Sequence, residues 1–375
     1  MHDQRIRIAA LAALIPACLA VGWWLYVWLS GVLSYWGAGA VASRWLAAAG
    51  AVLALSTFLI RPIPVKVTTI AVIYLLIFSL PACALQKIMA LFFPSAADPG
   101  WLWQGGIAAL ACSAALLLYG VIHGKRIVVK RYTLHTPLPV PGGELRIALI
   151  SDVHMGLTID AARLRREMDR LAKEKPDLLV IAGDLVDDQT SPAQMRAACT
   201  IAGSLPTTCG AYFAYGNHDL AGHGPTPPNT KAQLDEALTG AGIHILDDQS
   251  RVAAGLTLIG RRDAVFTRRP DRASLRQLLD GADKTRPIIL IDHQPRELKE
   301  AAAAGVTVQL SGHTHAGQVW PMSWLCRLFG VAYGHRRIGH MDVIVSSGMG
   351  NRGSALRSGC TAEMVLIRLC GSGIQ

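Results

Sequence analysis

The sequence lacks paired cysteines and has no repeated or biased segments. Eight cysteines are scattered over 375 residues, three in apolar stretches and five in the polar half, and none forms a C-x-x-C pair. This spacing excludes a dense disulfide framework and argues against a zinc–thiolate site. We therefore expect reduced thiols in a cytosolic compartment. The chain also shows no internal repeat and no low-complexity tract, so a repeat array is not expected.

Acidic side chains are almost absent before residue 140, and charged side chains of either sign are scarce before about residue 123. Over the whole chain only 17% of residues are charged, 51% are hydrophobic, and the mean hydropathy is +0.34. This composition is more apolar than that of most soluble proteins. Because the apolar excess lies almost entirely in the first third, the sequence predicts two parts that meet different solvents.

Four apolar stretches in the first third are long enough to cross a bilayer, at residues 8–29, 38–60, 67–91 and 105–122. The first has no charged side chain and exceeds the length of a signal-peptide core, so we expect it to remain in the membrane. Arg44 and Lys87 fall near the ends of their spans, where long side chains can reach the interface. The sequence predicts a four-helix transmembrane anchor over residues 1–131.

Basic residues beside these spans gather on one face of the predicted membrane, which identifies that face as cytoplasmic. They are Arg5, Arg7, Arg61, Lys66, Lys125, Arg126, Lys130 and Arg131. An even number of spans then places the rest of the chain in the cytoplasm. We expect a multi-pass protein of the bacterial inner membrane with its C-terminal domain on the cytoplasmic side. The net charge of +10 is explained by contact with membrane lipids, and no nucleic-acid partner is expected.

Residues 132–144 contain prolines and glycines near their end and are predicted to be a linker. From Leu145 to the C-terminus at residue 375, short β-rich runs alternate with amphipathic stretches, which indicates a layered domain of helices and strands. Strands are predicted at residues 145–150, 178–181, 211–215, 288–291, 306–310, 343–345 and 364–369. Helices are predicted at residues 159–173, 192–204, 231–239, 273–279 and 296–304.

Almost every predicted strand runs into a short cluster of side chains that can bind metal. The clusters are Asp152 and His154 in SDVHMG, Asp184 in AGDLVDD, Asn217, His218 and Asp219 in YGNHDL, His293 in IDHQP, and His313 and His315 in SGHTH. Strand ends in a layered fold converge on one edge, so these residues are expected to meet in one pocket. Imidazole and carboxylate ligands without thiolate favour Mn, Fe or Zn over Ca. One such motif alone is usually an ordinary core or surface feature, and the prediction depends on five in succession.

This succession resembles the calcineurin-like metallophosphoesterase superfamily, over roughly residues 145–369. The phrases ILIDHQP, SSGMG and AEMVLIRL are most similar to the bacterial YkuE and YaeI type of phosphodiesterase, and the anchor resembles that of multi-span relatives. The resemblance implies an α+β fold: a four-layer sandwich of two β-sheets flanked by helices, preceded by four transmembrane helices. It also implies a metal-dependent phosphoric ester hydrolase that uses two divalent ions.

The family pattern assigns each candidate residue a role. It implies that Asp152, His154 and His315 hold one ion, that Asn217, His293 and His313 hold the other, and that Asp184 bridges both. His218 is then a catalytic residue that stabilises the transition state or protonates the leaving oxygen. Asp219 either orients the His218 imidazole or serves only as a turn-capping carboxylate.

Large apolar residues follow the last metal motif, in the segment VWPMSWLCRLF at residues 319–329. This segment either receives acyl chains or packs on a sheet. With the anchor, it favours a phosphodiester or pyrophosphate bond of a lipid or nucleotide-lipid at the cytoplasmic leaflet. Two alternatives stay open: hydrolysis of a soluble nucleotide with the anchor as a tether, and a non-catalytic, metal-stabilised sensor or scaffold. Several arginines either contact phosphate or are solvated: Arg261, Arg262, Arg268, Arg269, Arg336, Arg337, Arg352 and Arg357.

Overall fold

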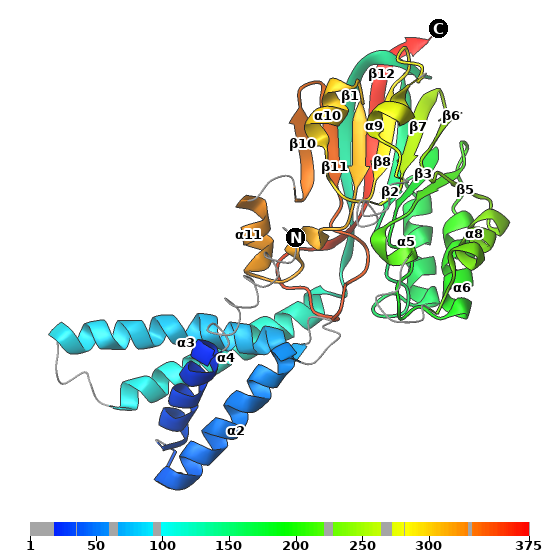
Figure 1. Cartoon of the computed structure of the whole chain (residues 1–375). Helices are drawn as coiled ribbons and strands as arrows, with labels where there is room; N and C mark the ends of the chain where they lie inside the picture. Colours follow the sequence, from blue (N-terminus) through cyan, green and yellow to red (C-terminus); the bar gives the residue numbers. More distant parts are fainter. Residues whose placement is uncertain are drawn as a thin grey trace, which may run out of the picture. The chain divides into compact units, whose positions relative to one another are not determined.

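The computed structural model describes residues 19–34, 36–59, 67–92, 99–220, 228–263, 272–280, 282–328 and 332–374. The chain forms two compact units, Met1–Tyr119 and Gly120–Gln375. Figure 1 shows the helices of the first unit in blue and cyan, and the strands and helices of the second in green to red. The boundary between the units, after Tyr119, falls within one continuous helix, 12 residues before the predicted end of the anchor at residue 131.

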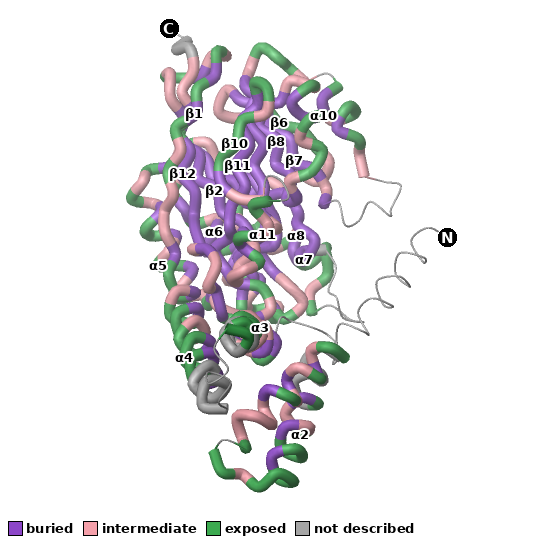
Figure 2. The backbone as a smooth tube through the Cα atoms, turned by 90° about the vertical axis from the view of Figure 1, so that its left-hand side faces the viewer, coloured by how far each residue is buried: buried purple, intermediate pink, exposed green. Residues whose placement is uncertain are grey.

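The described residues of the first unit are helical apart from the turn at residues 36–39. Its helices are Leu19–Ser34, α2 (Ala40–Leu59), α3 (Val67–Phe92) and α4 (Pro99–His123), which continues into the second unit. A small core joins Leu25, Ala51 and Val72. Many large apolar side chains face outward instead, as the green stretches of α2 and α4 in Figure 2 indicate. Such an exterior is expected of helices whose solvent is lipid.

One segment of the described residues, Gly106–His123, is both long and apolar enough to cross a membrane. Three shorter apolar segments accompany it, at Leu19–Ser34, Ala40–Val52 and Val67–Pro81. Residues 1–18, 60–66 and 93–98, which carry parts of the predicted spans and several of the basic residues used for orientation, lie outside the described residues. The four-span anchor and its orientation therefore stay predictions.

Two mixed β-sheets of six strands each form the centre of the second unit. The first sheet has the order β1-β12-β2-β3-β4-β5, with β1 (Ile127–Pro141), β2 (Glu144–Ile150), β3 (Leu178–Ala182), β4 (Ala211–Ala214), β5 (Ile243–Ile245) and β12 (Ala362–Ile374). The second has the order β10-β11-β9-β8-β7-β6, with β6 (Gln249–Ala253), β7 (Leu256–Arg261), β8 (Ile288–Asp292), β9 (Val308–Ser311), β10 (Gly334–Ile338) and β11 (Met341–Val345). All seven predicted strands coincide with observed ones.

Helices cover the outer face of each sheet. A core cluster joins β2, β3 and β4 to α5 (Ala161–Ala172), α6 (Pro192–Gly203) and α8 (Lys231–Gly240), and another joins β8 and β11 to α9 (Leu275–Leu279) and α10 (Leu298–Ala303). A third cluster lies between the two sheets. The remaining helical segments are α7 (Asn217–Leu220), a 3-10 turn at His315–Gly317 and α11 (Met322–Leu328). The layers are therefore helix, sheet, sheet and helix, as the family resemblance implied.

Strand β3 shows why the central strands are continuous apolar runs. Leu179 and Ile181 point to the helices, whereas Val180 and Ala182 point to the second sheet. Successive side chains of a strand alternate between faces, and both faces of this sheet are covered. Every residue of β3 is accordingly buried.

The predicted linker is wrong for most of its length, because Ile127–Pro141 forms β1. This strand pairs in parallel with β12, from Ile127 opposite Ala362 to Pro141 opposite Ile374. Proline cannot donate to a β-ladder and is tolerated on edge strands. Since β1 is the first strand in the sheet order and pairs on one side only, its prolines interrupt no second ladder.

Candidate metal centre

The carboxyl ends of five strands carry the candidate ligands. In the first sheet, β2, β3 and β4 are followed by Asp152, Asp184 and Asn217. In the second sheet, β8 is followed by His293 and β9 by His313. In both sheets the polar side chains therefore follow the carboxyl ends of strands, which is where layered folds bind ligands.

The first group of ligands consists of Asp152, His154 and His315, all buried, with potential ligand atoms within 4.8 Å of one another. Nε2 of His154 lies 3.2 Å from Nε2 of His315, and the latter lies 3.4 Å from Oδ1 of Asp152. The carboxylate of Asp152 also accepts the backbone N–H of His313 at 3.0 Å, which ties this group to the next one.

The second group of ligands consists of Asp184, His293 and His313, again with ligand atoms within 4.8 Å of one another. Nε2 of His293 is 3.2 Å from Oδ2 of Asp184, and Nδ1 of His313 is 2.8 Å from Oδ1 of Asn217. Oδ2 of Asp184 is also 3.8 Å from Nε2 of His154. Asp184 therefore lies between the two groups, and all seven predicted ligands converge.

Backbone strain is concentrated at this site. Five of the seven candidate ligands have a left-handed backbone conformation that non-glycine residues rarely adopt: Asp152 (φ 50°), His154 (φ 45°), Asp184 (φ 54°), His313 (φ 70°) and His315 (φ 46°). Such residues cost free energy and tend to cluster where function fixes the direction of a side chain. Two glycines complete the packing, since a Cβ on Gly216 or Gly312 would lie 2.2 Å or 2.3 Å from a carboxylate oxygen of Asp184 or Asp152.

The donor atoms fit divalent cations. Nδ1 of His293 donates to the backbone oxygen of Ala182 at 2.7 Å, which leaves Nε2 with a free lone pair, and this buried atom has no hydrogen-bond partner. Nε2 of His154 and Nε2 of His315 are 3.2 Å apart, a distance at which one of them donates a proton to the other, and a cation bound there would displace that proton. Nitrogen and carboxylate donors of this kind suit Mn, Fe and Zn.

Charge within the cluster shifts the pKa values of the candidate ligands in both directions. Burial raises the pKa of Asp184, but His293 and His154 outweigh this and hold it well below its usual value. Burial, together with His154 and Arg357, holds the pKa of His315 well below its usual range. Asp184 and His315 therefore have the protonation states that metal ligation requires. Burial lowers the pKa values of His154 and His293, but Asp187 and Asp184 outweigh it and raise them, so a cation bound by these imidazoles would displace a proton.

His218 and Asp219 lie beside the ligands and differ in what they contact. The His218 ring is edge-on to that of His154, with centroids 5.1 Å apart, and its backbone N–H donates to Oδ1 of Asp184 at 2.8 Å. The Asp219 carboxylate accepts backbone N–H groups from Asp184, Gly216 and Val186 at 2.7, 2.8 and 3.1 Å. These contacts favour the turn-capping alternative for Asp219.

Sequence reasoning missed one supporting residue. Oδ2 of Asp187 lies 3.3 Å from Nδ1 of His154, on the side of the ring away from the ligand group. Metal-binding histidines commonly face a carboxylate through their second ring nitrogen, which fixes the ring orientation. The doubled Asp in AGDLVDD, which begins three residues after Asp184, was the available signal.

The arginines noted in the sequence do not form one group. Arg357 and Arg261 are buried, Arg336, Arg337 and Arg352 are exposed, Arg262 is half-buried, and Arg268 and Arg269 lie outside the described residues. Arg261 pairs with Asp292 and Glu297, at 3.5 and 2.7 Å. The two buried arginines, Arg261 and Arg357, are therefore not solvated, because each has fixed partners inside the domain.

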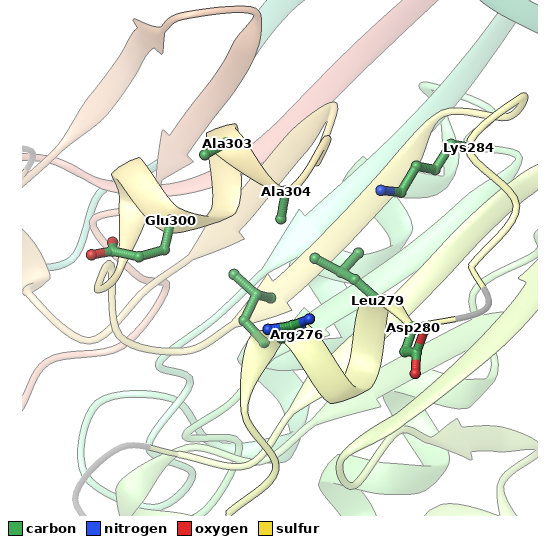
Figure 3. A pocket seen from close by; sticks show the side chains of 8 residues that line it. Arg276, Leu279, Asp280, Lys284, Glu300, Ala303 and Ala304 are labelled. Atoms are coloured by element: carbon green, nitrogen blue, oxygen red, sulfur yellow. The ribbon is translucent and has the colours of Figure 1, made fainter.

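A surface hollow of about 450 Å³ lies between α9 and α10, and it is lined by residues other than the candidate ligands. Figure 3 shows Arg276, Asp280, Lys284 and Glu300 around it, with apolar side chains between them. The hollow has mixed charges and no converging set of donor atoms, so the strand-end cluster is the stronger candidate for chemistry among the described residues.

Comparison with known proteins agrees with this geometry. Residues 145–317 match the family model of the calcineurin-like phosphoesterases. The chain is 31% identical to a "Transmembrane protein with metallophosphoesterase domain" from Danio rerio, over 70% of this chain and 62% of that protein. It is 29% identical to an uncharacterised metallophosphoesterase of Helicobacter pylori strain J99, over 60% of each chain, and 27% identical to YkuE of Bacillus subtilis, over 46% of this chain and 59% of YkuE.

The chain thus spans about 60% of the length of these curated relatives. A solved structure, TT1561 of Thermus thermophilus, aligns with 55% of this chain and 89% of its own, with 13% identity and a TM-score of 0.37, too low to add weight. The family model and the relatives support the assignment of the C-terminal domain to the calcineurin-like metallophosphoesterase superfamily.

Proposed function

We propose that this protein is a membrane-anchored phosphoesterase that uses two divalent metal ions to hydrolyse a phosphodiester or pyrophosphate bond. The observation that carries the proposal is the convergence of seven nitrogen and oxygen ligands from five strand ends, with Asp184 between the two groups. Asp152, His154 and His315 would hold one ion. Asn217, His293 and His313 would hold the other, and Asp184 would contact both.

Bound divalent ions supply positive charge to the phosphate oxygens and make a water molecule more acidic. The chain itself supplies the geometry. Asp187 and the Ala182 carbonyl hold the rings of His154 and His293 with one nitrogen directed to the ligand groups. His218 lies beside the first group of ligands, where its imidazole can donate a proton to the leaving oxygen or stabilise developing negative charge. Asp219 fixes the turn that carries His218.

The reaction is tested with purified full-length protein reconstituted with Mn²⁺, Zn²⁺ or Fe²⁺. A panel of phosphodiesters, lipid pyrophosphates and phosphomonoesters would be assayed beside the His218→Ala variant. We expect metal-dependent hydrolysis of a diester or a pyrophosphate that the variant lacks. Metal binding without hydrolysis of any panel member would favour the sensor or scaffold alternative.

A lipid or nucleotide-lipid substrate is supported by the apolar surface of α11. Met322, Trp324 and Leu328 are 50%, 58% and 62% exposed, whereas Ser323 between them is buried. The helix begins shortly after His315, so its outer face is close in sequence to a candidate ligand. Exposed Trp, Met and Leu side chains of this kind insert into the boundary between headgroups and acyl chains. Trp320 and Leu325 are only half-buried, so the segment does not pack fully on a sheet.

Replacing Trp324 with Asp tests this class of substrate. We expect Trp324→Asp to lower kcat/KM for a phospholipid substrate in mixed micelles about tenfold or more, because a carboxylate opposes insertion at the interface. Hydrolysis of a soluble chromogenic diester should stay within about twofold of the wild type. The matched control is Val252→Asp, since Val252 is similarly exposed, at 56%, but lies on β6. Equal loss on both substrates would instead indicate a folding defect.

The membrane orientation follows from the basic residues beside the spans. We propose that the C-terminal domain lies on the cytoplasmic side of a bacterial inner membrane. We expect a reporter that functions in the cytoplasm to be active when it is fused after Gln375, and a reporter that functions outside the cytoplasm to be inactive there. The control is each reporter fused to a secreted protein. Activity of an extracytoplasmic reporter at that position would contradict the proposal.

A further inference from the structure

The last turn of α4 is held by the loop between β11 and β12. The backbone N–H of Arg357 donates to the oxygen of Gly120 at 3.0 Å, and the backbone oxygen of Arg357 is 3.1 Å from Nδ1 of His123. On its other side, the His123 ring is 3.2 Å from the Thr361 hydroxyl. A Cβ on Gly120 would lie 2.9 Å from Leu356, so the helix and the loop are in close contact.

The side chain of Arg357 runs from this contact to the candidate metal centre. Its Nε donates to Oδ1 of Asn351 at 2.8 Å, and its Nη1 and Nη2 donate to the backbone oxygens of Ser347 and Gly350 at 3.0 and 2.6 Å. Nη2 also lies 3.4 Å from Nδ1 of His315. The backbone of Arg357 therefore contacts the membrane-proximal helix, while its guanidinium contacts a candidate ligand.

The loop held by Arg357 also contacts a second ligand. The backbone N–H groups of Met349 and Gly350 donate to the oxygens of Ser151 and Asp152 at 3.0 and 2.8 Å. Since Arg357 binds the carbonyl of Gly350, it fixes the strand end that presents Asp152 as well as the ring of His315. Two of the three members of the first group of ligands are thus linked to one guanidinium, His315 directly and Asp152 through Gly350.

Burial of this guanidinium has a cost that a purely structural role does not explain. Arg357 is fully buried, and its hydrogen-bond partners are neutral carbonyl, amide and sulfur groups. A buried charge without a directly bonded counter-charge is destabilising, and an apolar side chain would fill the same space at lower cost. The five donors of arginine in a fixed plane are suited to holding several carbonyl groups in one arrangement, while the guanidinium lies beside the His315 ring.

We propose that Arg357 is a positioning residue that links the last turn of α4 to the first group of ligands. The membrane-proximal helix is then a structural part of the metal centre and not only a tether. Displacement of its last turn moves Arg357 and with it His315 and Asp152, so the affinity for one of the two ions depends on α4. This inference rests on the proposed two-metal function.

The test is Mn²⁺ binding to purified full-length protein in detergent, measured by calorimetry and elemental analysis beside kcat and KM for a soluble diester. We expect Arg357→Met to weaken binding of one ion about 10- to 100-fold and to leave the other unchanged, the range for residues that orient metal ligands. Arg357→Lys should recover part of the affinity. His123→Ala, which touches no ligand, should shift the same ion by a smaller factor.

The matched control is Arg163→Met. Arg163 donates to the backbone oxygens of Lys125, just beyond α4, and Thr158, each at 2.7 Å, and neither is a candidate ligand. Circular dichroism identifies any variant that does not fold. If Arg357→Met does not fold, the metal affinities of Arg357→Lys and His123→Ala decide the outcome. The inference would be overturned, and the proposed function would stand, if Arg357→Met bound two ions with wild-type affinity. The same holds if His123→Ala and Arg163→Met weakened metal binding by the same factor. A wild-type chain that binds no Mn²⁺ would overturn the proposed function and the inference with it.

Discussion

Asp184→Ala is expected to abolish stable binding of both metal ions and to lower kcat/KM for a phosphodiester about 1,000-fold or more. Oδ2 of Asp184 lies 3.2 Å from His293 and 3.8 Å from His154, so its removal takes an anionic ligand from each group. Metal ions contribute several kcal/mol to charge stabilisation in such reactions, and each 1.36 kcal/mol corresponds to about a tenfold change in rate. Elemental analysis after gel filtration and steady-state kinetics at saturating Mn²⁺ measure the two effects.

Alanine at this position also perturbs the backbone, and a second variant separates the two causes. Asp184 has a φ of 54°, which alanine adopts poorly, and its Oδ1 accepts the N–H of His218. Asp184→Asn keeps the shape, tolerates that backbone conformation and keeps an oxygen for His218, but it removes the charge. We expect it to fold normally and still to lose metal. The control Asp160→Asn alters only the N-cap of α5. Full metal content with near-normal activity in both Asp184 variants would refute the bridging role.

The ligand positions could be predicted from sequence because each one directly follows a strand buried on both faces. The apolar runs before Asp152, Asp184 and His293 mark those strands, and the polar clusters mark their ends. The topology of parallel strands then brings distant residues together without further information. Strand β7 (Leu256–Arg261) has the same apolar pattern and could have been found in the same way, although it carries no ligand.

Other features depend on tertiary contacts that no local pattern reveals. Strand β1 was obscured by its prolines, and its existence depends on pairing with β12, more than 200 residues later in the chain. Arg357 resembles any surface arginine in sequence, and its burial follows from carbonyls that only the folded loop presents. Likewise, the three N–H groups that bind Asp219 come from two separate turns. Local signals therefore indicated the candidate ligands, but not the residues that support them.

His218→Ala is expected to keep both metal ions and to lower kcat about 100- to 10,000-fold, the usual contribution of a general acid or base. The imidazole is not among the seven candidate ligands, and the contact of His218 with Asp184 is made by its backbone N–H, which alanine retains. Metal content should therefore equal that of the wild type. The control His244→Ala removes a histidine of β5 that contacts Arg251 and Tyr212, away from the ligands. Loss of metal in His218→Ala would make His218 a ligand instead.

The leaving group distinguishes the two roles open to His218. If the imidazole protonates the leaving oxygen, a diester with an acidic phenol as leaving group needs little help, and His218→Ala should hydrolyse it far better than an alkyl diester. If the imidazole stabilises charge on the phosphate oxygens, both diesters should lose activity by a similar factor, because that charge develops whichever group departs. The ring lies beside His154 of the first group of ligands, and burial within a domain of low dielectric strengthens either effect. Hydrolysis of a lipid phosphodiester releases an alcohol that is a weak acid. If His218 is the proton donor, His218→Ala must therefore lose most of its activity on the proposed substrate. An equally large loss on the phenolic diester would assign His218 to charge stabilisation.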